Sequence, residues 1–136
     1  MGGDMSLLSE ISRIRDGRGN PAALVGEFRR TPVLIPLSGD NLMSTESDGI
    51  RWLFAFTDEE ALARFLAHRG ISPEEAPDHV SAVGARLLDV VIPAIGSPAG
   101  VALNAGSELG MLFPPVTGIV PDAVAVDLAD AAGGAV

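Results

Sequence analysis

Two apolar segments constrain the fold of this chain most strongly. The first, residues 31–37, reads Thr-Pro-Val-Leu-Ile-Pro-Leu without polar alternation, which is typical of a strand covered on both faces. Its prolines, Pro32 and Pro36, are expected to mark the strand ends, because proline cannot donate to a sheet ladder. The second segment, residues 50–57, alternates two sets of side chains that are both largely apolar. Both strands therefore require covering layers.

Helical patterns that could provide these layers flank the strands. Residues 7–14 place four apolar side chains on one helical face, and Asn20 with Pro21 is expected to begin a second helix that runs to Arg30. Thr57 with Glu60 has the spacing of a capping box and predicts a third helix. The other expected elements are a loop or wide hairpin connection at 38–49, a short strand at 80–83, a helix around 87–92 ended by Pro93 and Gly96, a strand at 100–104, and a turn or brief helix capped by Ser107.

These elements predict an α+β fold, with a small mixed β-sheet of three to five strands flanked by helices in a single domain. Within it we expect an N-terminal helical segment at 1–30 and an α+β core at 31–116. Residues 117–136 are rich in small residues and contain acids but no bases, so we expect a partly ordered acidic tail.

Charge and composition exclude several functions. The 136 residues carry 18 acids and 9 arginines and no lysine, for a net charge of −9, so nucleic acid is not an expected partner. The absence of cysteine excludes disulfides and thiolate sites. No apolar run is long enough for a membrane span and no signal peptide is apparent, so we expect no membrane partner and a cytoplasmic location.

Catalytic and metal-binding signatures are also missing. The only histidines, His68 and His79, are expected on the surface, and no spacing of histidines fits a zinc site. Ser97 lies in a glycine-proline turn that does not keep the order of a nucleophile elbow. We therefore expect no metal and no cofactor, and a solvated acidic loop at Asp40, Glu46 and Asp48.

Four blocks in this order resemble the SseB N-terminal-domain family. They are the strand at 33–36, the block Phe-Ala-Phe-Thr-Asp-Glu-Glu at 54–60, the helix around Leu87-Leu88, and Val-Ala-Leu-Asn-Ala-Gly-Ser at 101–107. The resemblance covers about residues 22 to 115 and depends on the order of the blocks. It implies a fold, and it implies no particular reaction, because no biochemical activity is established for that family.

Two hypotheses for function remain. The missing catalytic groups favour a non-catalytic binding or regulatory module that acts through a protein partner or a homo-oligomer, on a sheet that short helices do not fully cover. The alternation of its strand favours a core position for Trp52, and an edge position or an uncovered face would make it the contact residue. The alternative is a small-metabolite binder or enzyme. The sequence therefore does not decide whether the protein is an enzyme, although the missing catalytic groups favour a protein that is not. Its pocket would combine Arg51 for a carboxylate, Asp58 as a base, and the hydrogen-bonding side chains Asn104 and Ser107.

Overall fold

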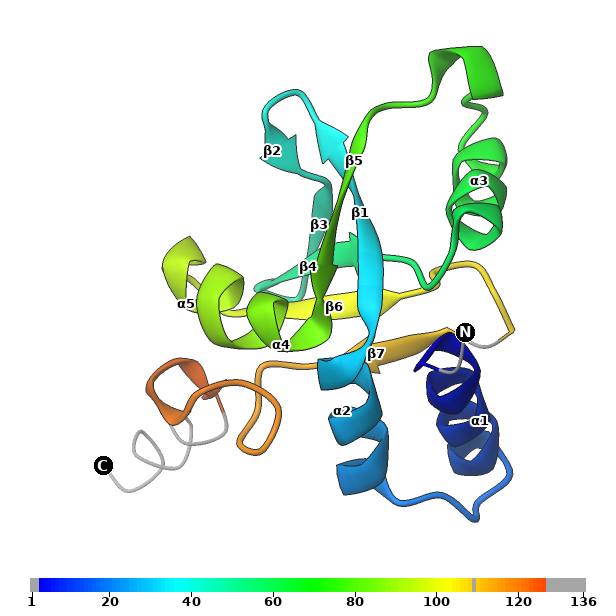
Figure 1. Ribbon diagram of the computed structural model, residues 1–136. Helices are drawn as coiled ribbons and strands as arrows, with labels where there is room; N and C mark the ends of the chain where they lie inside the picture. Colours follow the sequence, from blue (N-terminus) through cyan, green and yellow to red (C-terminus); the bar gives the residue numbers. More distant parts are fainter. Residues whose placement is uncertain (1–2, 109, 127–136) are drawn as a thin grey trace.

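Two small β-sheets form the centre of the molecule (Figure 1). A computed structural model describes residues 3–108 and 110–126. The three-stranded sheet has the order β2 (Asn41–Leu42), β1 (Pro32–Ser38), β5 (His79–Val83), and is antiparallel throughout. The four-stranded sheet has the order β3 (Ser44–Ser47), β4 (Ile50–Ala55), β6 (Ala99–Leu103), β7 (Met111–Phe113). In this sheet β4 and β6 run parallel and the other pairs are antiparallel. Mostly antiparallel sheets with separate helices make an α+β fold, as the sequence predicts.

One pair of residues links the two sheets. Leu34 in the middle of β1 and Phe56 just after β4 exchange two backbone hydrogen bonds, of 2.8 and 2.9 Å. The strand β1 therefore uses one edge for β5 and, at Leu34, the other edge for Phe56. Side chains of both sheets therefore contribute to the same apolar clusters.

The expected end of β1 at Pro36 is wrong. The strand continues to Ser38, where it pairs with β2. Proline is tolerated at this position because the Pro36 carbonyl points away from β5 and accepts the Met43 N–H at 2.8 Å. In an antiparallel pair the N–H of a residue points to the same side as its carbonyl, so Pro36 lacks only a donor that β5 does not need.

Two connections contain more strand than the sequence indicates. The segment 38–49 holds β2 and β3, and β3 forms a hairpin with β4 through Asp48 and Gly49. Ser107 does not cap a helix, because the chain turns back at 104–107 and then forms β7. Short polar strands such as β3 are missed because they lack the alternation that marks a half-buried strand.

Helices cover both faces of these sheets. The paired helices α1 (Gly3–Arg15) and α2 (Pro21–Arg30) contribute buried Leu7, Ile11 and Phe28 to the larger apolar cluster. The Asn20 side chain accepts the Ala22 N–H at 2.8 Å, as the predicted cap requires. None of the described helices is both long and apolar enough to cross a membrane.

The helix α3 (Glu59–His68) covers the opposite face, and its cap differs from the prediction. Asp58, not Thr57, accepts the Ala61 N–H at 2.8 Å, so the helix begins one residue later than expected. Thr57 is buried and bonds Asn104 instead. The Thr57 side chain, which the local pattern assigns to the helix cap, is therefore bonded to a residue far away in the sequence.

A third helical segment runs from α4 (Gly84–Arg86) through a π-helical stretch (Leu87–Val91) to α5 (Ile92–Ile95). The prediction that Pro93 contributes to ending this helix is wrong, since the helix continues to Ile95 and stops at Gly96, which has a φ of +81°. The wide π turn relieves the clash between a proline ring and the carbonyl four residues earlier.

A paired arginine and aspartate connect this segment to α2. Arg29 donates to both carboxylate oxygens of Asp89, at 3.1 and 2.6 Å. These hydrogen bonds lower the pKa of Asp89 and raise that of Arg29. Both side chains are more than a third exposed, so the pair contributes on the order of 0.5 kcal/mol.

The buried side chains form two clusters, one on each side of the parallel strands. The larger contains Leu53 and Val101 with the α1, α2 and α5 side chains, and the smaller contains Phe54 and Phe56 with α3. The described part of the expected tail joins the larger cluster through Val120 and Ala125, around a 3₁₀ turn at Asp122–Val124. Residues 127–136 of that expected tail lie outside the described residues.

Candidate functional site

The carboxyl ends of β4 and β6 are joined by two polar side chains. Asn104, which follows β6, is 3% exposed and has a φ of +52°. Its Oδ1 accepts the Thr57 N–H at 3.0 Å, and its Nδ2 donates to the Thr57 hydroxyl at 3.1 Å. Both ends of the amide are therefore occupied in holding the parallel strands together. This arrangement assigns Asn104 a structural role at the strand ends.

Asp58 and Ser107 lie at the same end of the sheet. Asp58 accepts the Ala61 N–H as the helix cap, and its other oxygen accepts the Thr57 hydroxyl at 3.3 Å. Ser107 closes the turn after Asn104, donating its N–H to the Asn104 carbonyl at 3.0 Å. Three of the four predicted pocket residues are thus brought to one end of the sheet, where Asn104 and Asp58 complete the local fold.

Arg51 is not brought together with these residues. It lies near the start of β4, opposite Ala99, whereas Ala55 at the end of that strand is opposite Leu103. Its guanidinium donates to the Ser44 hydroxyl at 2.9 Å and lies 3.6 Å from Glu46. The four residues therefore do not form the shared pocket that the sequence predicts.

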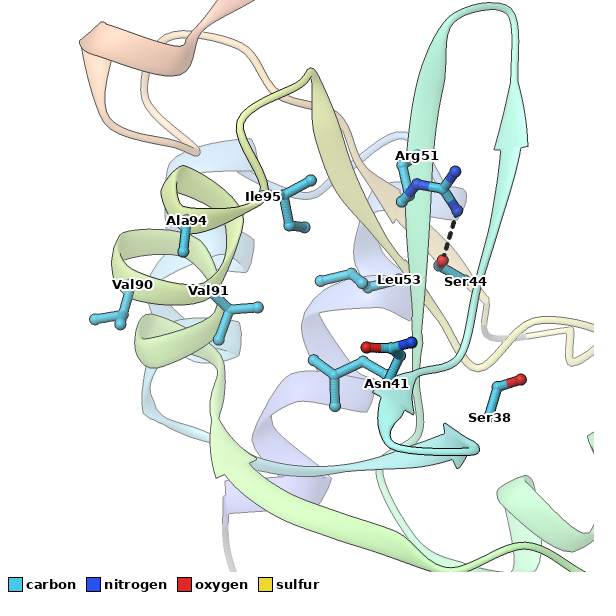
Figure 2. Close-up of a pocket in the computed structure, with 10 residues that line it drawn as sticks. Ser38, Asn41, Ser44, Arg51, Leu53, Val90, Val91, Ala94 and Ile95 are labelled. Carbon is cyan, nitrogen blue, oxygen red and sulfur yellow. Dashed lines mark hydrogen bonds between the residues drawn. The ribbon is translucent and has the colours of Figure 1, made fainter.

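Arg51 instead lines a separate cleft of about 720 Å³ (Figure 2). One wall comes from β1 to β4, where polar side chains alternate with Leu42 and Leu53, and Ser44 lies beside Arg51. The other wall is apolar and comes from the third helical segment, through Val90, Val91, Ala94 and Ile95. The cleft thus combines one cation with an apolar wall.

Trp52 lies on the other face of β4, on a surface that we call the Trp52 face. Cross-strand neighbours define it: Thr45 and Gly100 flank Trp52, Ser47 is opposite Ile50, and Ala102 is opposite Leu112. The indole lies across Gly100, since a Cβ built there would be 2.8 Å from Trp52 Cζ3. The ring is half-buried and supported by the neighbouring strand.

The helix α3 covers only one end of this surface. Phe54 and Phe56 pack against Phe65, with ring centroids 4.8 and 5.0 Å apart, and the Arg69 guanidinium lies 4.7 Å from the Phe65 centroid. Beyond this end, Leu112 is 58% exposed and a shallow cleft of about 390 Å³ runs beside Trp52. The Trp52 face therefore combines apolar side chains with Thr45 and Ser47, and its second half is open among the described residues.

One family model matches most of the chain. The model of the SseB protein N-terminal domain matches residues 7–117, which is more than half of the chain. The chain belongs to the SseB family. No curated protein and no solved structure shows a significant match to it. The family match also includes residues 7–15 of α1, which the resemblance found in the sequence did not cover.

The four blocks of that resemblance fall at structurally important places in the SseB domain. They lie within β1, at the junction of β4 with α3, at the start of the π-helical stretch, and at the end of β6 with Asn104. The second and fourth blocks are the two partners of the Asn104–Thr57 contact. The blocks that resemble the family thus include the residues that join β4, β6 and α3. None of the blocks includes Arg51 or Trp52.

The histidines of the SseB domain are exposed, as expected, His68 at the end of α3 and His79 at the start of β5. Within residues 3–108 and 110–126, no three side chains of the metal-ligating types are grouped to hold an ion. The sequence reasoning did not identify Leu112 as a surface residue, because Met111-Leu112-Phe113 is too short for a strand pattern. It also did not identify Val90 and Ile95, whose cleft forms only when the helical segment packs against the strands.

Proposed function

We propose that this SseB domain is a non-catalytic module that binds another protein on its Trp52 face. The observation that carries the proposal is the open half of that face, where half-buried Trp52 lies beside Leu112, which is 58% exposed. Large rigid aromatic side chains with apolar neighbours are the residues that contribute most to protein interfaces.

The charges around this surface restrict the partner. Asp48 lines the cleft beside Trp52, Arg15 lines a second cleft beside Leu112, and the whole chain has a net charge of −9. A partner with an apolar centre, a basic side chain opposite Asp48 and an acidic side chain opposite Arg15 would complement this surface, and opposite charges at a rim mainly raise the association rate.

Replacing Leu112 by arginine is expected to abolish capture of the partner without unfolding the domain, because the native side chain is mostly exposed. The measurement is affinity capture of the tagged full chain from a lysate, with bound proteins quantified by mass spectrometry. Ala123→Arg is the matched control, because it adds the same charge at an exposed position in the 3₁₀ turn. The proposal requires a protein that is bound by the native chain and the control and lost at least tenfold with Leu112→Arg. Equal capture by all three chains, or no specific capture, would contradict it.

The Arg51 cleft supports a second candidate, the binding of a small carboxylate with an apolar body. Arginine recognises carboxylates through two parallel hydrogen bonds, and Val91 and Ile95 could contact an alkyl chain on the opposite wall. Glu46 competes for the same guanidinium from 3.6 Å. This candidate retains one of the four residues of the metabolite pocket predicted from the sequence.

Hexanoate is expected to raise the melting temperature of the native chain, because a ligand that binds the folded state stabilises it. Hexanol, which lacks the carboxylate, should give no shift, and Arg51→Gln should remove the shift with hexanoate. Glu46→Gln should enlarge the shift at the same hexanoate concentration, because it removes the competing carboxylate. Differential scanning fluorimetry measures all four. An equal shift with Arg51→Gln, or no shift of the native chain, would exclude this site.

A further inference from the structure

The strand β5 forms an exposed edge of the three-stranded sheet. It pairs with β1 on one side only, because the order of the sheet is β2, β1, β5. Four of its five residues are exposed, including two valines that are 42% and 43% exposed, Val80 and Val83. Figure 1 shows β5 running beside β1 with no helix drawn across it.

The backbone of β5 directs hydrogen-bonding groups away from the sheet. In β1, both Leu34 backbone groups bond Phe56, and the Pro36 carbonyl bonds Met43. The residues opposite them, Ser81 and His79, therefore do not exchange hydrogen bonds with β1. Their N–H and C=O groups point outward, and among the described residues these groups have no strand partner. This is the pattern that an added strand completes.

The other sheet edges are protected in ways that β5 is not. Proteins commonly limit edge pairing by shortening an edge strand or placing charges on it. The edge strands β2 and β7 have only two and three residues, and β3 carries Glu46. The five residues of β5, His-Val-Ser-Ala-Val, include no proline, acid, lysine or arginine. An open edge of this length, without proline, carboxylates, lysine or arginine, is suited to strand pairing.

The ends of β5 indicate which strand would pair with it. Asp78 precedes the strand and Arg86 follows it closely, and neither has an ion-pair partner among the described residues. Antiparallel pairing of two identical strands places the acidic start of each copy toward the basic end of the other. A two-fold axis at Ser81 also sets His79 opposite Val83 of the second copy. The edge is therefore complementary to itself in both hydrogen bonds and charge.

We propose that the SseB domain forms a two-fold symmetric dimer in which β5 pairs antiparallel with β5 of a second copy. Ser81 of the two copies face each other at the axis, and the two three-stranded sheets become one continuous sheet. An interface of this kind is isologous and closes on itself, so it gives dimers and not filaments. The proposal involves no residue of the Trp52 face and is independent of the partner proposed for that face.

Substitutions at Ser81 test the symmetric register. Like charges directly opposite each other on paired strands are destabilising. Ser81→Lys and Ser81→Glu are therefore each expected to lower the association constant of the dimer at least tenfold, so that each variant is monomeric. An equimolar mixture of the two variants is expected to restore the dimer, since lysine then faces glutamate. Ser97→Lys, at an exposed loop position, is the matched control and should remain dimeric.

Sedimentation equilibrium of the full chain over a hundredfold range of concentration measures the association, and far-UV circular dichroism confirms that each variant is folded. A dimeric native chain, two monomeric variants and recovery in the mixture are the expected results. A native chain that stays monomeric throughout the range would overturn the proposal. So would a dimer that persists in Ser81→Lys, or variants that fail to associate when mixed.

Discussion

Replacing Phe56 by alanine is expected to lower the free energy of unfolding by about 3 to 5 kcal/mol, the usual cost of truncating a buried phenylalanine. The side chain is fully buried, and its ring packs against Phe65 of α3 at a centroid distance of 5.0 Å. Its backbone forms the two hydrogen bonds to Leu34 that link the sheets. The cavity would thus open where β1, β4 and α3 meet, and urea unfolding followed by far-UV circular dichroism measures the loss.

Leu112→Ala is a suitable comparison for this substitution. Leu112 lies in the same sheet but is 58% exposed, so its truncation is expected to change the free energy of unfolding by less than about 0.5 kcal/mol. If both variants lost similar stability, Phe56 would not occupy the interior of the smaller cluster. A loss below about 1 kcal/mol for Phe56→Ala would have the same meaning.

The central strands could be predicted from the sequence because their patterns depend on burial. The residues of β4 alternate between two clusters, with Phe54 in one and Leu53 in the other, and both sets are apolar as expected. The cap of α2 could also be predicted, since Asn20 and Pro21 act on groups within three residues. Elements with a strong local signal or with two buried faces were therefore identified, although the ends of β1 and of the third helical segment were misplaced.

Elements that depend on distant partners were placed less well. Thr57 has the spacing of a cap, but its side chain bonds Asn104, which lies 47 residues away. The strand β3 consists of Ser-Thr-Glu-Ser and forms because β4 supplies an edge for it. Neither partner is visible in the local sequence. These errors follow from tertiary contacts that override propensity.

The predicted pocket failed for a reason that the sequence itself contains. Arg51 is the second residue of the expected strand and Asp58 follows its end, so an extended chain places them seven steps apart, about 23 Å at 3.3 Å per residue. Asp58 and Asn104 did come together, because β4 and β6 are parallel neighbours and their carboxyl ends meet. Strand length could have excluded Arg51, whereas the pairing of β4 with β6 needed the structure.

Replacing Gly84 by alanine is expected to lower the free energy of unfolding by about 3 kcal/mol, at the upper end of the usual cost of overpacking. A Cβ at this position would be 2.1 Å from the Phe28 carbonyl oxygen and 2.8 Å from the carbonyl carbon. Gly84 also donates its N–H to the Thr31 carbonyl at 3.0 Å, so the two backbone segments are held together at this distance. Relief of the clash must separate the end of α2 from the start of α4.

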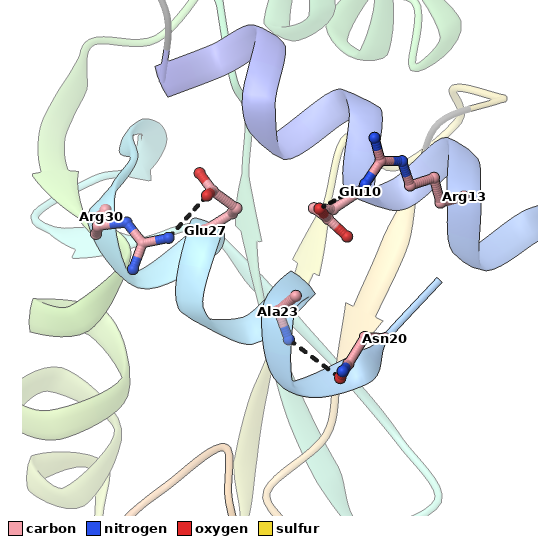
Figure 3. A network of polar contacts seen from close by, with 6 residues as sticks. All are labelled: Glu10, Arg13, Asn20, Ala23, Glu27 and Arg30. Atoms are coloured by element: carbon pink, nitrogen blue, oxygen red, sulfur yellow. Dashed lines mark hydrogen bonds and ion pairs between the residues drawn. The ribbon is translucent and has the colours of Figure 1, made fainter. Parts of the chain in front are cut away.

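Gly26→Ala makes the same chemical change with the opposite expected result. Gly26 lies inside α2, and its Cβ would meet only the flexible end of Arg30, at 3.5 Å from Nη1. That guanidinium is held by Glu27 at 2.7 Å on the helix surface (Figure 3). Alanine should therefore raise the free energy of unfolding by about 0.5 to 1 kcal/mol, because it restricts the unfolded chain more than glycine does. Urea unfolding of both variants measures whether the free energy of unfolding falls for Gly84→Ala and rises for Gly26→Ala. A stabilising Gly84→Ala would mean that α2 and α4 do not approach as closely as their backbones indicate.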